Sequence, residues 1–275
     1  MSVADKLQIL NTIKSDIKTA INSKGGNVGD DFTTYATAIE NIEGGTGGEG
    51  YFEITNDTSL AFSQFTTVPS NIRLGSSTTK AKNLFRQCEK LTRLPDWDFS
   101  NINNAYYMCN NCKALEGVVY LNMPKVTDCQ YMFYNTPNLT SIELPNTNNC
   151  KTFSNAFNDY TKGDAILEHL GEIDCTSVTS GGTSNMVYYQ TNLVDVGGFK
   201  NLGMGFEKLS KNYSLNLQES RKLSAESLEN IIRGLADVNE ISNGYTCTIN
   251  IANTLVSLIP EDIIAIATRK GWTVA

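Results

Sequence analysis

Hydrophobic residues recur at a fixed interval of 24 positions through the middle of this chain. One column is formed by Phe85, Cys109, Phe133 and Phe157. Three further columns keep the same register, formed by Cys88, Cys112 and Thr136, by Leu91, Leu115 and Leu139, and by Leu94, Val118 and Ile142. One repeat of this length cannot bury its own apolar residues, but stacked repeats bury them against each other. The pattern therefore predicts a solenoid of about five stacked turns over residues 51–222.

Each repeat has two halves with different hydrophobic periods. In the first half, apolar residues spaced i, i+3, i+4 and i+7 predict a short helix. Its first copy consists of Ala81, Leu84, Phe85 and Cys88. The second half is extended and rich in asparagine, which can satisfy backbone groups between turns. Such loop positions are Asn101, Asn104, Asn148 and Asn149. A 24-residue unit of this kind predicts an α/β, leucine-rich-repeat-like fold.

The repeat becomes irregular after Phe157. The segment TKGDAILEH interrupts the array before Leu170 and Ile173 restore the register. A further copy follows at Met186, Val187, Leu193, Val196, Phe199 and Leu202. Insertions in solenoids map to loops, so His169, the single histidine, is expected in a surface loop rather than in a catalytic site.

Residues 1–43 carry a helical pattern. Residues 3–21 are amphipathic after an N-cap at Ser2, and a second helix is expected after Asp30 or Asp31, beyond the Gly25-Gly26 break. The predicted core of this hairpin is Leu7, Leu10, Ile13, Ile17, Ile21, Phe32, Tyr35 and Ile39. About 40 residues make a marginal core. The hairpin is therefore expected to anchor the chain on a partner protein or on further copies of itself, for example in a trimer. GGTGGEG (44–50) predicts a flexible linker.

Residues 223–275 are expected to cap the last open turn of the array. Ser224 lies between Leu223 and Leu228 in a hydrophobic staple that opens a helix over 224–238. Alternation over 245–251 predicts a strand. Pro260 begins a last helix, and WTVA after it predicts a short closing strand.

Charge and composition narrow the function classes. The chain carries 22 Lys and Arg against 29 Asp and Glu, and the net charge of −7 argues against nucleic-acid binding. We expect neither a membrane span nor a signal peptide, because charges interrupt every long apolar run. The seven cysteines favour reduced, buried thiols over disulfides. Cys109 and Cys112 form one CxxC motif, but a zinc site lacks further ligands at usable spacing. No metal or cofactor is expected.

Enzyme chemistry is not expected either. Asp96 and Asp98 flank Trp97 in a repeat turn, and Glu261 and Asp262 suit the first turn of a helix, so neither pair indicates a glycosidase. The better candidates are tyrosines at repeat positions predicted to point outward: Tyr106, Tyr107, Tyr131, Tyr134, Tyr188 and Tyr189. Such a row can stack on sugars or anchor a protein partner. Packing between neighbouring turns is an equally open interpretation.

Three segments resemble one group of proteins. The turns of the form AKNLFRQCEKLTRLPDWDFSN resemble BspA-like leucine-rich repeats of bacterial surface proteins and phage structural genes. The ending RKGWTVA resembles the C-terminal cap of those phage and prophage proteins. ILNTIKSDIKTAINSKGG and VGDDFTTYATAIENI are similar to the helical leader of many phage tail and fibre proteins.

This resemblance implies a non-enzymatic virion protein of a tail, fibre or head appendage. Residues 1–43 would dock on other virion proteins, and the solenoid would contact a host-surface glycan or protein. Assembly in the host cytoplasm would need no export signal. A bacterial cell-surface adhesin and a purely architectural decoration remain the alternatives.

Overall fold

The computed structural model describes residues 3–23, 51–56, 58–160 and 163–275. The chain divides into two compact units, residues 1–52 and 53–275. In the first unit, α1 (Val3–Ser23) confirms the helix expected over residues 3–21. Within α1, Ile13 is exposed, Ile17 is half-buried and Ile21 is buried. The remaining anchoring residues (Leu7, Leu10, Phe32, Tyr35 and Ile39), the Ser2 cap, the second helix and the linker 44–50 lie outside the described side chains and residues.

The second unit consists of short strands followed by a helical end. Its strands are β1 (Phe52–Ile54), β2 (Ile72–Leu74), β3 (Gly117–Tyr120), β4 (Leu139–Glu143), β5 (His169–Leu170), β6 (Ile173–Asp174), β7 (Asp195–Val196), β8 (Phe199–Lys200), β9 (Tyr213–Leu217), β10 (Cys247–Ile251) and β11 (Trp272–Val274). Its helices within the described residues are α3 (Ala225–Gly234), α4 (Asn253–Val256) and α5 (Glu261–Arg269). The sheets run β1-β2, β3-β4-β5-β7, β6-β8 and β9-β10-β11. Strands β3 to β11 pair in parallel.

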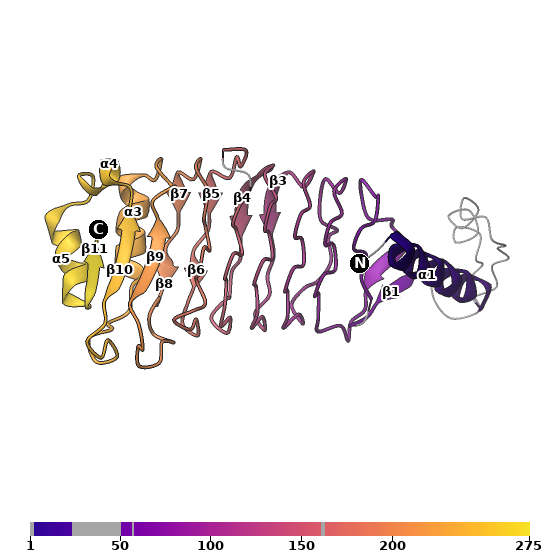
Figure 1. Ribbon diagram of the computed structural model, residues 1–275, viewed down its shortest axis with the longest axis horizontal. Coiled ribbons are helices and arrows are strands. Elements are labelled where there is room, and N and C mark those ends of the chain that lie inside the picture. The colour runs from indigo at the N-terminus through magenta and orange to yellow at the C-terminus, as the bar shows by residue number, and fades with distance from the viewer. Residues whose placement is uncertain (1–2, 24–50, 57, 161–162) are drawn as a thin grey trace. The chain divides into compact units, whose positions relative to one another are not determined.

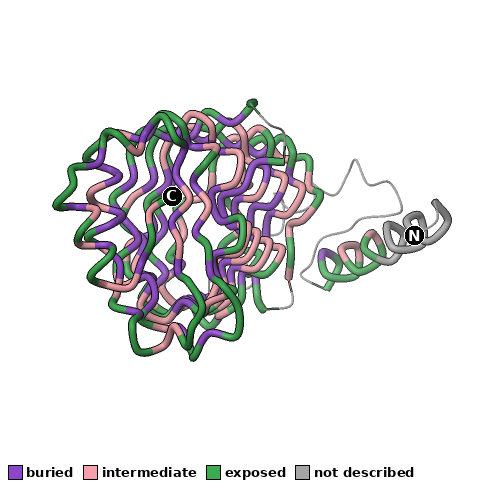
Figure 2. The backbone as a smooth tube through the Cα atoms, turned by 60° about the vertical axis from the view of Figure 1, so that its left-hand side comes forward, coloured by how far each residue is buried: buried purple, intermediate pink, exposed green. Residues whose placement is uncertain are grey.

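Backbone hydrogen bonds join equivalent positions of successive turns. The donors Phe85, Cys109 and Phe133 lie 24 residues apart. Their N–H groups donate to the carbonyls of Met108, Met132 and Ala156 at 2.7, 2.8 and 2.8 Å. The 24-residue period is therefore confirmed. The turns lie side by side (Figure 1), and buried positions recur from one turn to the next (Figure 2).

The helix predicted for the first half of each repeat is wrong. Ala81, Leu84 and Phe85 are buried as expected, but the segment is a series of tight turns. Asn83 and Gln87 have φ angles of 57° and 58°, in the left-handed region that interrupts an α-helix. Two consecutive tight turns place apolar residues at the same spacing as one face of a helix. The spacing alone therefore does not distinguish tight turns from a helix. The described repeats over residues 81–160 therefore contain no helix, although the α/β fold expected from the sequence requires one in each repeat.

One predicted core position is also wrong. Val118 is 69% exposed, whereas Val119 is buried. The register of β3 against β4 shifts between Gly117 and Val118, and Gly117 has a φ of 77°. This bulge moves the inward alternation by one residue. Val118 and Tyr120 therefore point outward.

The C-terminal end follows the expected order with shifted boundaries. Ser224 caps α3, its Oγ accepting from Ser227 N at 3.1 Å, and the helix ends at Gly234 rather than at residue 238. The strand expected from residue 245 begins at Cys247, and Tyr245 stays outside it. Helix α5 after Pro260 and strand β11 are confirmed. Strand β9 and helix α4 were not expected.

Candidate binding surface on the tyrosine turns

The candidate tyrosines lie on the tight turns, in a column of left-handed backbone. Asn83, Tyr107, Tyr131 and Asn155 are spaced 24 residues apart and have φ angles of 57°, 57°, 55° and 55°. Asparagine tolerates this conformation, whereas a bulky residue there is an outlier. Two of the four positions nevertheless hold tyrosine. Their backbones still join the ladder, with Tyr107 N donating to Gln130 O at 3.0 Å.

The structure brings four of the six predicted tyrosines together. The rings of Tyr107 and Tyr131 stack, with centroids 4.6 Å apart and planes 8° apart. This separation matches the spacing of about 4.8 Å between neighbouring strands, so the ladder itself sets the stacking distance. Tyr106 packs edge-on against Tyr107 with ring centroids 4.4 Å apart. Tyr134 packs edge-on against Tyr131 with ring centroids 5.4 Å apart.

A fifth ring, Tyr160, was missed by the sequence analysis. It is 72% exposed, and its ring centroid lies 6.4 Å from that of Tyr134. It occupies the column of Cys88, Cys112 and Thr136, a column that is inward in the first repeats. The irregularity of the repeat after Phe157 was the available sign that this column changes direction. We refer to Tyr106, Tyr107, Tyr131, Tyr134 and Tyr160 as the tyrosine cluster.

Tyr188 and Tyr189 form a pair in the following turn. Their centroids are 4.0 Å apart, and a hydrogen bond from Tyr188 to Tyr189 raises the pKa of Tyr188. Asp159 N donates to Tyr188 O at 3.1 Å, which places this turn next to the one that ends at Tyr160. All six predicted tyrosines are half-buried rather than fully outward. The ring contacts between turns cover part of each side chain.

Two cations lie over the first rings of the cluster. Lys82 Nζ is 5.4 Å from the Tyr106 ring centre, and Arg86 Cζ is 5.1 Å from that of Tyr107. Burial, followed by contact with Tyr106 and Tyr131, raises the pKa of Tyr107 to about 12 against the opposing effect of Arg86. The Tyr107 hydroxyl is therefore a protonated donor at neutral pH.

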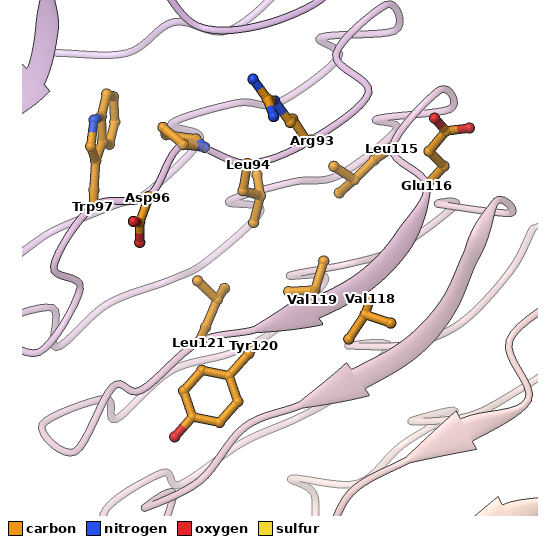
Figure 3. A pocket seen from close by; sticks show the side chains of 11 residues that line it. Arg93, Leu94, Asp96, Trp97, Leu115, Glu116, Val118, Val119, Tyr120 and Leu121 are labelled. Atoms are coloured by element: carbon orange, nitrogen blue, oxygen red, sulfur yellow. The ribbon is translucent and has the colours of Figure 1, made fainter. Parts of the chain in front are cut away.

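A second feature of the array is a cleft beside β3, which the sequence analysis also missed. Its volume is about 220 Å³. Leu94, Val119 and Leu121 point toward one another across it, and Tyr120 points away (Figure 3). Pro95 has no N–H and occupies the repeat position held by Val119 one turn later. Among the described residues, no backbone hydrogen bond joins 93–97 to Val118 or Tyr120, so the cleft opens where the ladder stops.

The prediction that His169 lies in a loop is wrong, because this residue belongs to β5. It pairs in register with Ser141 of β4 and Asp195 of β7. His169 Nδ1 lies 3.4 Å from Asp195 Oδ2, with both side chains about half exposed. No hydrogen bond between Ser141 and His169 is present in the described structure.

The cysteines behave as core residues. All seven are buried, free thiols, as the sequence analysis predicted. Burial raises the pKa of Cys175 well above its ordinary value, and it raises that of Cys109 likewise. Within the described part of the chain, no group of histidines, cysteines and carboxylates could hold a metal ion. No described helix is long and apolar enough to cross a membrane.

Residues 57–170 match a family model described as "Mycoplasma protein of unknown function, DUF285", a family tied to BspA-like repeat proteins. The matched segment contains the tyrosine cluster and the Pro95 cleft and ends in β5. No curated protein and no solved structure matches the chain. The repeats over 57–170 are thus similar to a family whose own description assigns no activity.

Proposed function

We propose that this chain is a non-enzymatic phage virion protein of a tail, fibre or head appendage, whose repeats form a leucine-rich-repeat-like solenoid that binds a host-surface glycan or protein. The observation that carries the binding role is the placement of Tyr107 and Tyr131 on left-handed backbone. A left-handed conformation costs an ordinary residue roughly 1–2 kcal/mol. Backbone strain of this kind concentrates at functional sites.

The neighbouring repeats adopt the same backbone conformation without a tyrosine, which supports a role for these rings other than packing. Asn83 and Asn155 occupy the same column with the same backbone geometry and carry no ring. Tyrosine at such a position offers a rigid ring and a hydroxyl, which are features of binding surfaces. The tyrosine cluster is therefore the proposed contact surface of the solenoid.

The virion assignment is supported by the resemblance of residues 1–43 to phage leaders and of the C-terminus to phage caps. In this proposal residues 1–43 dock on other virion proteins and associate with their own copies, for example as a trimer. Helix α1 carries the exposed Ile13 that such packing would cover. Assembly takes place in the host cytoplasm.

A bacterial cell-surface adhesin is the second candidate function. It is supported by the matching family model, whose description names Mycoplasma proteins. Immunogold electron microscopy with antibody against residues 51–275 separates the two. Gold on purified phage particles is the expected result, with tail label favouring host recognition and head label favouring decoration. Gold on bacterial envelopes, with none on particles, would overturn the virion assignment.

A cell-binding assay tests the contact surface. The purified full chain carrying Tyr107→Asn and Tyr131→Asn is expected to lose binding to host cells. Tyr120→Asn is the matched control, because Tyr120 is 65% exposed on β3 and lies outside the cluster. Equal binding by the unsubstituted chain, the double variant and Tyr120→Asn would show that the cluster is not the contact surface.

A further inference from the structure

Two cations lie beside the tyrosine cluster, and they differ in pairing from Lys113 and Arg73 elsewhere in the array. Lys113 pairs with Glu89 at 2.9 Å, and Arg73 pairs with Glu53. In the described residues, neither Lys82 nor Arg86 forms an ion pair, although the chain has a net charge of −7. Two unneutralised positive charges therefore lie at one end of the tyrosine cluster.

Arg86 also has an unused hydrogen-bond donor. Its Nε atom is buried and has no hydrogen-bond partner in the structure. The guanidinium lies over the Tyr107 ring. A guanidinium stacked on an aromatic ring keeps its donors in its own plane, where they suit two oxygens of a carboxylate or phosphate.

The ring faces of Tyr107 are already occupied. Arg86 comes from the preceding turn and Tyr131 from the following turn, so they cover opposite faces of the ring. A sugar cannot stack on a face covered in this way. At Tyr107 the cluster therefore presents the ring edge and the hydroxyl donor beside two cations.

We propose that the tyrosine cluster binds an anionic glycan, with Lys82 and Arg86 holding its carboxylate or phosphate groups and the tyrosine hydroxyls donating to neighbouring sugar oxygens. This inference rests on the proposed function, because it names the ligand class of the same contact surface. The charge and the donors both select for anionic oxygen, which a neutral polysaccharide does not supply.

The test measures binding of the full chain to three immobilised polymers: a polyuronate, a glycerol-phosphate polymer and neutral dextran. Binding to one or both anionic polymers, and not to dextran, is the expected result. Preference between the two identifies a carboxylate or a phosphate as the recognised group. Added salt weakens binding because it screens the charges.

Two double variants remove the same charge from different places. Lys82→Gln with Arg86→Gln is expected to weaken binding about tenfold or more, because charge-assisted hydrogen bonds are lost. Lys208→Gln with Lys211→Gln, both exposed beyond the cluster, is the control and is expected to change binding less than about twofold. Arg86→Lys keeps the charge but loses the planar fork, so partial binding is expected. Circular dichroism checks that each variant is folded.

Equal binding to dextran, or equal loss in the two double variants, would overturn the anionic-glycan inference. If Tyr107→Asn with Tyr131→Asn still abolishes cell binding in that case, the contact surface stands and only its ligand class is wrong. If neither the tyrosine variant nor the Lys82 and Arg86 variant changes cell binding, both proposals fail.

Discussion

Replacing Tyr131 by asparagine separates a binding tyrosine from a structural one. The substitution installs the residue that Asn83 and Asn155 already provide in the same column. It relieves about 1 kcal/mol of left-handed strain at a φ of 55°. It also removes the stacked contact with Tyr107, worth about 0.5–1.5 kcal/mol. The expected change in the free energy of unfolding is therefore small, within about 1.5 kcal/mol in either direction.

Phe133 in the same repeat provides the comparison. It is 1% exposed and has no left-handed φ angle. Phe133→Ala is expected to cost about 3–5 kcal/mol, because it leaves a cavity in the stacked core. Urea unfolding of the full chain, followed by circular dichroism, gives both values. A loss above about 3 kcal/mol for Tyr131→Asn would show that the tyrosines are packing residues and would refute the reasoning.

Three further predictions concern a close approach, a cap and a titration. Gly197→Ala is expected to cost about 1–3 kcal/mol, because its Cβ would lie 2.5 Å from a backbone nitrogen of the preceding turn. Gly171→Ala meets only a flexible carboxylate and should cost less; equal thermal shifts would contradict this. Ser224→Ala is expected to cost about 0.5–2 kcal/mol by removing the cap of α3, and Ser224→Asn should retain most of it in the same melting experiment. The raised pKa of Tyr107 means that its contribution to stability is complete below pH 10 and is lost as the pH rises toward about 12. Absorbance titration should show the phenolate step near pH 12 missing in Tyr107→Asn, and an unchanged titration would contradict the assignment.

The 24-residue period could be predicted from sequence because apolar columns are independent of local backbone conformation. The conformation within each repeat could not, since tight turns and a helix give the same spacing over Ala81 to Cys88. Asparagine at 83 and 155 was a sign of left-handed backbone, but tyrosine at 107 and 131 concealed it. Tyr107 and Tyr131 lie at left-handed positions that residue propensities do not predict, and these are the positions proposed to bind.

The tyrosine cluster was predictable in part. Column positions correctly brought Tyr107 and Tyr131 together, but they could not show that Arg86 covers one ring. The Pro95 cleft depends on a bulge at Gly117 and on a missing N–H at Pro95. Each is a single-residue departure from the repeat, and a periodic pattern does not report such departures. The position of His169 was also predicted wrongly. The fourth repeat contains an insertion, but the chain returns to the sheet at β5, which includes His169.

The ladder between turns has a consequence for how this protein can change over generations. Over the described residues 81–156, each turn bonds to its neighbours through donors that repeat every 24 residues. Duplication or loss of one 24-codon unit would therefore insert or remove one turn, altering the array by about 4.8 Å while leaving the contacts within the other turns unchanged. A duplicated unit containing Tyr131 would add one more ring to the stack. Reach and valency could thus be adjusted in whole steps, without redesign of any existing contact.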